Sequence, residues 1–173
     1  MYFTEGRQPI QRYMAFEWAL IEDIRRQATK PFENMTNKNP LSILFIEDDM
    51  IERMKFNRTV SKLGYENKII EANNGEEALK ILEGNSLLPH VILLDLNMPR
   101  ISGIEFLKRL KGDDRLRYIP TIVLTTSNNQ KDLLECYKIG IAGYILKPLK
   151  YDDYVDKIGK LLSYLEINQF ITT

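Results

Sequence analysis

Five short apolar segments alternate with five amphipathic segments between Leu41 and Leu165, and this alternation limits the possible folds more than any other feature of the chain. The apolar segments, which are rich in strand-forming residues, lie at 41–46, 68–72, 90–95, 121–125 and 143–147. The segments with helical spacing lie at 50–63, 75–82, 104–111, 129–139 and 151–165. Strands that alternate with helices predict an α/β fold with a parallel sheet. Because the strands are almost continuously apolar, we expect helices on both faces of the sheet.

Residues 1–40 precede this alternation and differ from it in character. Apolar residues recur about every 3.6 residues between Pro9 and Thr29, which predicts an amphipathic helix. Its apolar stripe needs burial against its own domain or a second copy, so a homodimer is one expected arrangement. The predicted organisation is an N-terminal helical extension with a linker over 1–40, an α/β domain over 41–166 and a C-terminal tail over 167–173.

Charge, cysteine and histidine content exclude several classes of function. The 24 basic and 24 acidic side chains give a formal net charge of zero, so there is no general attraction to nucleic acid or to an anionic membrane. Cys136 is the only cysteine and His90 the only histidine, which excludes an internal disulfide and multi-histidine or cysteine-rich metal sites. No apolar run approaches the roughly 18 residues of a membrane span, and no signal-peptide core is present. We therefore expect a cytoplasmic protein.

Polar side chains follow the predicted strands at their carboxyl ends. They are Glu47 and Asp48 after the first strand, Asp95 and Asn97 after the third, Thr125 at the end of the fourth and Lys147 at the end of the fifth. Because the carboxyl ends of parallel strands meet at one edge of a sheet, we expect these side chains to lie close together. Carboxylates gathered there repel one another unless a cation neutralises them, and all-oxygen ligands suit Mg²⁺.

Two further side chains extend this chemistry toward phosphate. Lys147 supplies a positive charge for a phosphoryl oxygen, and Thr125 supplies a hydroxyl donor. Metal, carboxylate, lysine and hydroxyl together are typical of phosphoryl transfer. The turn after the first strand, EDDM at 47–50, lacks the glycine or hydroxyl residues of a nucleotide-binding loop, which disfavours nucleotide or flavin binding. Each residue also has a structural explanation, since acids stabilise helix starts and threonine is common in strands.

Four motifs, in order along the chain, resemble the receiver domain of two-component response regulators. They are ILFIEDD at 43–49, VILLDLNMPRISG at 91–103, PTIVLTT at 120–126 and AGYILKP at 142–148. The resemblance covers residues 41–166 and implies a doubly wound five-stranded parallel sheet in the order 2-1-3-4-5, flanked by five helices. It also implies that Asp95 accepts a phosphoryl group from a phosphohistidine on a sensor histidine kinase or a histidine phosphotransfer protein.

The resemblance assigns a role to each residue at the strand ends. Asp48 resembles the direct ligand of Mg²⁺ and Glu47 its acidic partner, while Asp95 is nucleophile and ligand and Asn97 supplies its backbone carbonyl. Lys147 and Thr125 contact the phosphoryl group. Tyr144 occupies the place of an aromatic switch residue, with packing in the sheet as its structural alternative. The family commonly has a cis peptide bond at the position of Lys147–Pro148.

Three functions are consistent with these residues. The first is a stand-alone receiver that signals by contact with a downstream protein target or by phosphorelay, and that is not an enzyme beyond its own phosphorylation and dephosphorylation. Only residues 167–173 follow the last predicted helix, too few for a DNA-binding module. The second is a phosphorylation-independent interaction scaffold, against which the complete residue set argues. The third is a phosphohydrolase, for which the short connections leave no room for a specificity pocket.

Overall fold

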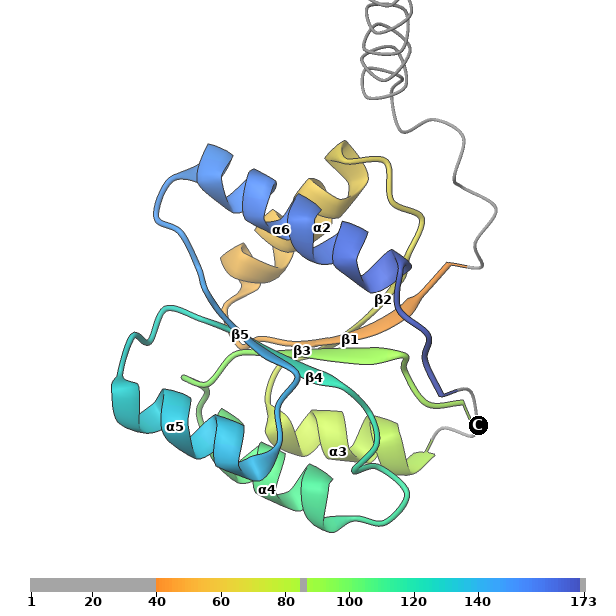
Figure 1. The fold of residues 1–173 in the computed structure, drawn as a ribbon, viewed down its shortest axis with the longest axis vertical. Coiled ribbons are helices and arrows are strands. Elements are labelled where there is room, and N and C mark those ends of the chain that lie inside the picture. Colours follow the sequence, from red (N-terminus) through yellow and green to blue (C-terminus); the bar gives the residue numbers. More distant parts are fainter. Residues whose placement is uncertain (1–39, 85–86, 172–173) are drawn as a thin grey trace, which may run out of the picture. The chain divides into compact units, whose positions relative to one another are not determined.

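The computed structural model describes residues 40–84 and 87–171, and its helices and strands alternate as the sequence predicts (Figure 1). The strands are β1 (Ser42–Ile46), β2 (Lys68–Ala72), β3 (Val91–Leu94), β4 (Thr121–Thr125) and β5 (Gly143–Leu146). The helices are α2 (Met50–Lys62), α3 (Gly75–Gly84), α4 (Gly103–Gly112), α5 (Gln130–Ile139) and α6 (Tyr151–Glu166). The predicted N-terminal helix and the linker up to residue 39 lie outside the described residues.

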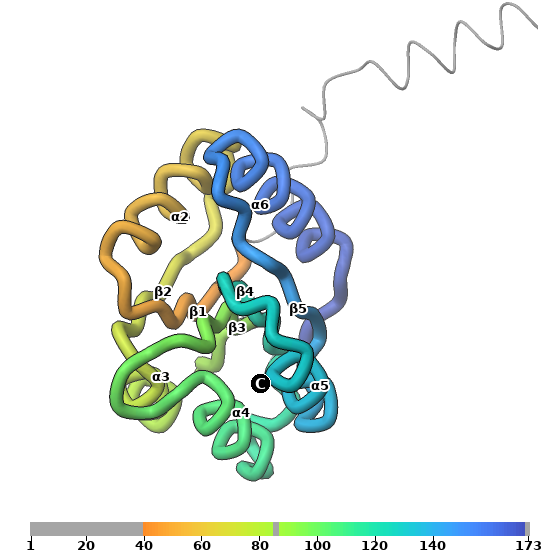
Figure 2. Tube along the Cα trace, turned by 90° about the vertical axis from the view of Figure 1, so that its left-hand side faces the viewer, coloured from red at the N-terminus to blue at the C-terminus, as the bar shows by residue number. Residues whose placement is uncertain are grey.

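The five strands form one parallel sheet in the order β2-β1-β3-β4-β5, which confirms the predicted doubly wound topology. Ile46, the last residue of β1, pairs with Ala72 on one side and Leu94 on the other, and Thr125 pairs with Leu146. This register aligns the carboxyl ends of the strands at one edge, which faces the viewer in Figure 2. The residues that follow the strands are therefore brought to a common edge.

Helices cover both faces of the sheet, as its apolar strands require. Helices α2 and α6 lie on one face, and α3, α4 and α5 lie on the other (Figure 1). Successive side chains of β1 alternate between the two resulting cores: Ile43 and Phe45 belong to the core under α2 and α6, and Leu44 and Ile46 to the opposite one. All four are fully buried, so neither face of the strand tolerates a polar residue. None of the described helices is long and apolar enough to cross a membrane.

At the opposite edge of the sheet, where the strands begin, His90 packs between β1 and the segment after α6. The backbone N–H of Ser42 donates to Nδ1 of His90 at 2.9 Å, and the His90 ring meets the ring of Phe170 edge-on at 5.8 Å between centroids. Phe170 lies beyond α6 and packs against the α2/α6 core. The single histidine of the chain is thus part of the fold at the edge away from the acidic residues.

Gly103 begins α4 directly against the backbone that follows β3. A Cβ atom at this position would lie 2.5 Å from the carbonyl oxygen of Asp95 and 2.7 Å from Cα of Leu96. Backbone atoms cannot move aside as a flexible side chain can. Gly103→Ala should therefore lower the free energy of unfolding by about 3 kcal/mol, the upper end of overpacking costs. Urea denaturation of the purified variant measures this loss.

Gly112, at the other end of the same helix, is the matched control. A Cβ atom there would have no heavy-atom neighbour within 4 Å. Gly112→Ala should leave stability unchanged or raise it by up to about 1 kcal/mol, because alanine has the higher helix propensity. Equal losses in the two variants would contradict the steric explanation for Gly103.

Candidate functional site

Three carboxylates meet at the carboxyl edge of the sheet. Glu47 and Asp48 follow β1, and Asp95 follows β3 in the neighbouring strand. One carboxylate oxygen from each of the three lies within 4.8 Å of the other two. Glu47 and Asp95 are only 2% and 3% exposed, whereas Asp48 is exposed to solvent. An all-oxygen donor set of this kind fits a hard divalent cation such as Mg²⁺, so the cluster could hold a metal.

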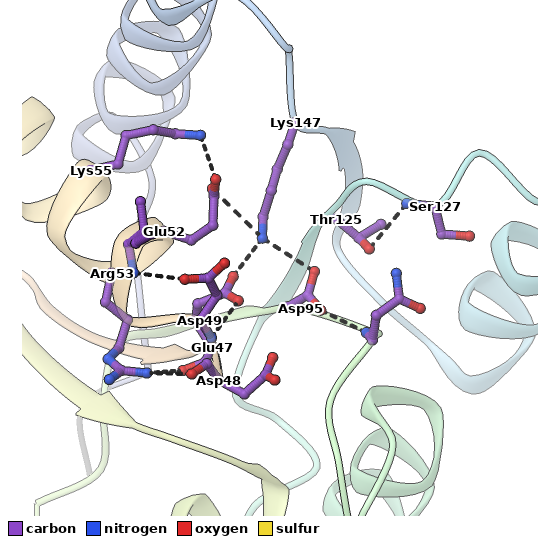
Figure 3. Close-up of polar contacts among 12 residues, drawn as sticks. Glu47, Asp48, Asp49, Glu52, Arg53, Lys55, Asp95, Thr125, Ser127 and Lys147 are labelled. Carbon is purple, nitrogen blue, oxygen red and sulfur yellow. Dashed lines mark hydrogen bonds and ion pairs between the residues drawn. The ribbon is translucent and has the colours of Figure 1, made fainter.

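Lys147 extends from the end of β5 into this acidic cluster (Figure 3). Its Nζ lies 2.5 Å from Oε2 of Glu47 and 3.3 Å from Oδ1 of Asp95. Burial lowers the pKa of Lys147, but the charges of Asp95, Glu47 and Glu52 outweigh burial and raise it, so the lysine stays protonated. Burial raises the pKa of Glu47 in spite of the hydrogen bond from Lys147. The positive charge of Lys147 therefore neutralises part of the negative charge of the three carboxylates at this edge of the sheet.

The turn after β3 fixes the orientation of the Asp95 carboxylate. The backbone N–H of Asn97 donates to Oδ2 of Asp95 at 2.6 Å, while Oδ1 faces Lys147. Each oxygen of Asp95 thus has its own cationic or N–H partner. The backbone carbonyl of Asn97, which the resemblance implies as a metal ligand, stays a prediction.

Thr125 and Tyr144 are connected through Ser127, on the other side of Asp95. Thr125 is fully buried, and its Oγ1 accepts a hydrogen bond from the backbone N–H of Ser127 at 3.3 Å. The Tyr144 hydroxyl donates to the backbone carbonyl of Ser127 at 2.9 Å. Burial raises the pKa of Tyr144, so its phenol keeps the proton that makes this bond. A polar connection therefore runs from the end of β4 to β5.

Arg53 holds the acidic turn after β1 in place. Its Nη1 donates to the backbone carbonyls of Glu47 at 2.7 Å and Asp48 at 3.1 Å, and its Nε lies 3.3 Å from Oε2 of Glu71 on β2. Asp49, the third acid of the turn, accepts from the N–H of Ile51 at 2.7 Å and caps α2. No sequence motif points to Arg53, because its role depends on how α2 lies on the sheet.

Glu52, in the first turn of α2, is a fourth acid at the site and was not predicted. Its Oε1 accepts from Nζ of Lys55 at 2.7 Å, and its Oε2 lies 3.9 Å from Nζ of Lys147 (Figure 3). An acid in a first turn is normally explained by the helix dipole, so the sequence pattern alone does not distinguish it. The five-residue spacing from Glu47 is the only signal that could have placed it near the cluster.

One expectation about the backbone is wrong. The Lys147–Pro148 peptide bond is trans, since no peptide bond among the described residues is cis. The trans form is the ordinary preference of bonds before proline, by about 0.5–1 kcal/mol. Lys147 reaches both Glu47 and Asp95 with this trans bond.

A doubly wound five-stranded sheet with an acidic cluster, a threonine and a lysine at its carboxyl edge defines the receiver class of α/β domains. The chain belongs to the response regulator receiver domain family, whose sequence model matches residues 43–159. This membership confirms the resemblance and places the protein in two-component signalling.

Individual relatives agree with this assignment. The chain is 34% identical over 131 residues to the probable methanogenesis regulatory protein FilR2 of Methanothrix harundinacea, covering 73% of this chain and 84% of FilR2. It is 33% identical over 122 residues to the chemotaxis protein CheY1 of Helicobacter pylori, covering 70% and 97%. The Mn²⁺-bound response regulator Rcp1 superposes with a TM-score of 0.71 at 29% identity, covering 76% and 99%. The phosphorylated cyanobacterial phytochrome response regulator RcpA gives 0.69 at 26% identity, covering 78% and 99%.

Proposed function

We propose that the chain is a phospho-receiver in which Asp95 accepts a phosphoryl group from a phosphohistidine of a sensor histidine kinase or a histidine phosphotransfer protein. One observation carries the proposal: the buried Asp95 carboxylate lies between the Asn97 amide and the Lys147 ammonium, within 4.8 Å of two further acids. Asp95 is the nucleophile in this proposal, and beside it lie two further acids that could hold a metal and a lysine that could bind a phosphoryl oxygen. The structure of phosphorylated RcpA shows that a relative of this fold carries a phosphoryl group.

The transfer step uses three side chains. An oxygen of Asp95 attacks phosphorus, and the new P–O bond forms as the P–N bond to the donor imidazole breaks. The electron pair of the P–N bond stays on the imidazole nitrogen, which takes up a proton from solvent. Lys147 neutralises charge on a phosphoryl oxygen. Thr125 accepts from the Ser127 amide, so its own hydroxyl proton is free to bind a second phosphoryl oxygen.

The residues that hold the metal in this proposal are Glu47, Asp48 and Asp95, with the backbone carbonyl of Asn97. A bound Mg²⁺ supplies positive charge to the phosphoryl oxygens. Three carboxylates and one carbonyl leave some positions of an octahedral ion to water, so we expect weak binding in the absence of phosphate. The relative Rcp1, solved with Mn²⁺, supports a divalent cation in this fold.

Asp48→Ala should weaken Mg²⁺ binding by about tenfold or more, because a hard cation loses an anionic ligand. Titration with Mg²⁺, followed through the backbone amide resonances of Asp95 and Asn97, measures the affinity. Asp49→Ala is the matched control, since it removes the same charge from the same turn. Its carboxylate caps α2, so the control should lose about 1 kcal/mol of stability and change the metal affinity far less. Equal affinities in wild type and Asp48→Ala would remove Asp48 from the metal site.

The surface around Asp95 is suited to a donor protein. Met50, Ile51 and Met54 on α2 are more than 60% exposed, and Leu149, two residues after Lys147, is fully exposed. Exposed apolar side chains beside a buried acceptor favour contact with another protein over hydrolysis of a small molecule.

The surface formed by α5, β5 and α6 is proposed as the output, where a downstream protein target binds. Leu134, Tyr137, Leu146 and Tyr151 are exposed there, and tyrosine is favoured at protein interfaces. The connection from Thr125 through Ser127 to Tyr144 gives a phosphoryl group on Asp95 a physical route to this surface.

Incubation of the full chain with acetyl phosphate and Mg²⁺ tests the proposed function. Intact-mass measurement over time should show one added phosphoryl group that persists after the donor is removed. The absence of an adduct would favour the alternative, a phosphorylation-independent interaction scaffold. Continuous release of phosphate without an adduct would favour a phosphohydrolase.

A further inference from the structure

We propose that Glu52 is a positioning residue that competes with the phosphoryl group for Lys147, and so lowers the affinity of the site for that group. The inference rests on the proposed function, because it concerns what Lys147 does when Asp95 is phosphorylated. Among the described residues, the side chain of Glu52 contacts Lys55 and Lys147. It acts on the phosphoryl site through Lys147 and not by direct contact with Asp95.

Lys147 has one more donor than it uses. An ammonium group carries three N–H donors. Two of them have acceptors at hydrogen-bond distance, Glu47 at 2.5 Å and Asp95 at 3.3 Å. The nearest further anion is Oε2 of Glu52, at 3.9 Å, and Figure 3 shows the Glu52 carboxylate between Lys55 and Lys147. A shift of roughly 1 Å would complete the third hydrogen bond.

Glu52 gains from such a shift. Its Oε2 is buried and has no hydrogen-bond partner among the described residues. A buried charged acceptor without a donor is costly, so the oxygen attracts any donor within reach. The hydroxyl of Tyr154 is also buried and unpartnered, but it is a neutral donor. Lys147 is a cation 3.9 Å from Oε2, so it gives the stronger attraction.

Lys55 limits the strength of this competition. Its Nζ donates to Oε1 of Glu52 at 2.7 Å and lies 4.2 Å from the centroid of the Tyr154 ring, which holds the ammonium from two sides. The Lys55 charge offsets part of the Glu52 charge and so weakens the attraction between Glu52 and Lys147. Removing Lys55 should therefore strengthen the hold of Glu52 on Lys147.

Phosphorylation changes which acceptors remain for Lys147. A phosphoryl group on Asp95 offers it new anionic oxygens, and in the proposed site Glu47 is drawn toward the metal. Glu52 holds no metal in this scheme, so its pull on Lys147 persists in the phosphorylated state. The resting contact and the phosphoryl contact then compete for one ammonium group.

Glu52→Gln in the full chain tests the inference, with beryllofluoride as a stable mimic of the phosphoryl group. At saturating Mg²⁺ the variant should bind beryllofluoride about fivefold more tightly than wild type, the factor expected for loss of one partly buried ion pair. Its affinity for Mg²⁺ alone should not rise, because Lys147 is then freer to occupy the acidic cluster. A merely structural role of Glu52 would weaken both affinities, so the opposite response of the two is the diagnostic result.

Lys55→Gln provides the reciprocal variant. It should weaken beryllofluoride binding by about threefold, and this effect should shrink in the Glu52→Gln/Lys55→Gln double variant, since Lys55 acts through Glu52. Asp156→Asn is the matched control: it removes one acidic charge from an exposed ion pair with Lys160 on α6 and should leave both affinities unchanged.

Beryllofluoride affinity in Glu52→Gln equal to or below that of wild type would overturn the inference while leaving the proposed function intact. Wild-type protein that binds neither beryllofluoride nor a phosphoryl group would overturn the proposed function and this inference with it. An increase that also appears in Asp156→Asn would show a general charge effect and would overturn the assignment to Glu52.

Discussion

Asp95→Asn should abolish phosphorylation of the chain by acetyl phosphate and Mg²⁺. Wild type should gain one phosphoryl group in the intact-mass spectrum, and the variant none. The reason is that an amide is a far weaker nucleophile than a carboxylate. Asp95 is held by the Asn97 amide on one oxygen and faces Lys147 with the other. Glu47 has comparable contacts with the Asp49 amide and Lys147. The Asp95→Asn variant therefore also tests whether Glu47 can take the acceptor role.

The loss should not come from unfolding. Lys147 lies 2.5 Å from Glu47 and should keep this contact in the Asp95→Asn variant, in which one of two neighbouring buried charges is removed. Thermal unfolding of the variant should therefore show an intact cooperative transition. Asp156→Asn, with an aspartate removed from the surface of α6, should be phosphorylated like wild type. A fully labelled Asp95→Asn protein would transfer the acceptor role to another acid of the cluster.

Lys147→Ala should separate phosphorylation from its consequence. The variant should still accept a phosphoryl group, because Asp95 and the acidic cluster remain, but the output surface should respond poorly. A nearly complete shift between two states needs about 5.5 kcal/mol of differential binding. Loss of a charge-assisted contact, about 1.5–3 kcal/mol, leaves a large share of molecules in the resting state. Amide resonances of β5 and α5, recorded with and without beryllofluoride, measure this shift, and a response as large as that of wild type would remove Lys147 from the switch.

The same variant, Lys147→Ala, should also show how much Lys147 stabilises the buried carboxylates of Glu47 and Asp95. Glu47 and Asp95 lose their buried counterion, so the free energy of unfolding near neutral pH should fall by about 3 kcal/mol. Burial already holds the pKa of Glu47 above its usual value, so the folded state binds more protons than the unfolded state just above that value. The contribution of Glu47 to the free energy of unfolding therefore falls as the pH rises from the usual pKa of glutamate to the raised pKa of Glu47. Removing Lys147 should raise the pKa of Glu47 further and so make this fall steeper.

Urea denaturation at about pH 5 and about pH 7 measures this difference. Lys147→Met, which keeps the apolar stem of the side chain, should show the same steeper pH dependence with a smaller loss of packing. An identical pH dependence in wild type and both variants would mean that Lys147 does not stabilise the charged form of Glu47.

The fold could be predicted because its strands are unambiguous. The strands β1, β3 and β4 are buried on both faces, and only a parallel sheet between two helical layers explains such continuous apolar runs. Boundaries differ by a residue or so: the predicted strand at 90–95 is Val91–Leu94, although the backbone N–H groups of His90 and Asp95 still donate to the carbonyls of Ser42 and Ile46 in β1.

Those site residues that directly follow a strand could be predicted, because the geometry of a parallel sheet fixes where they lie. Strand order and direction are enough to bring Glu47, Asp95 and Lys147 together, and the structure places them within contact distance. Glu52 and Arg53 were missed because their positions depend on the rotation of α2 about its axis, which apolar periodicity fixes only coarsely. The contacts of Ser127 depend on the path of a loop, for which the sequence has no periodic signal.

The contact between Glu47 and Lys147 joins residues that are 100 positions apart in the chain, and Lys147 follows Asp95 by 52 positions. On a ribosome that adds roughly 5–20 residues per second, Asp95 is therefore made about 3–10 s before its lysine. During that interval the growing chain lacks β5 and α6, and with α6 part of the cover over one face of the sheet. A nascent chain consequently has the aspartate before it has the lysine and the surface formed by α5, β5 and α6. If Asp95 is the acceptor, as proposed, only finished molecules can turn a phosphoryl group into a change of that surface, so chains still being made do not give a premature response.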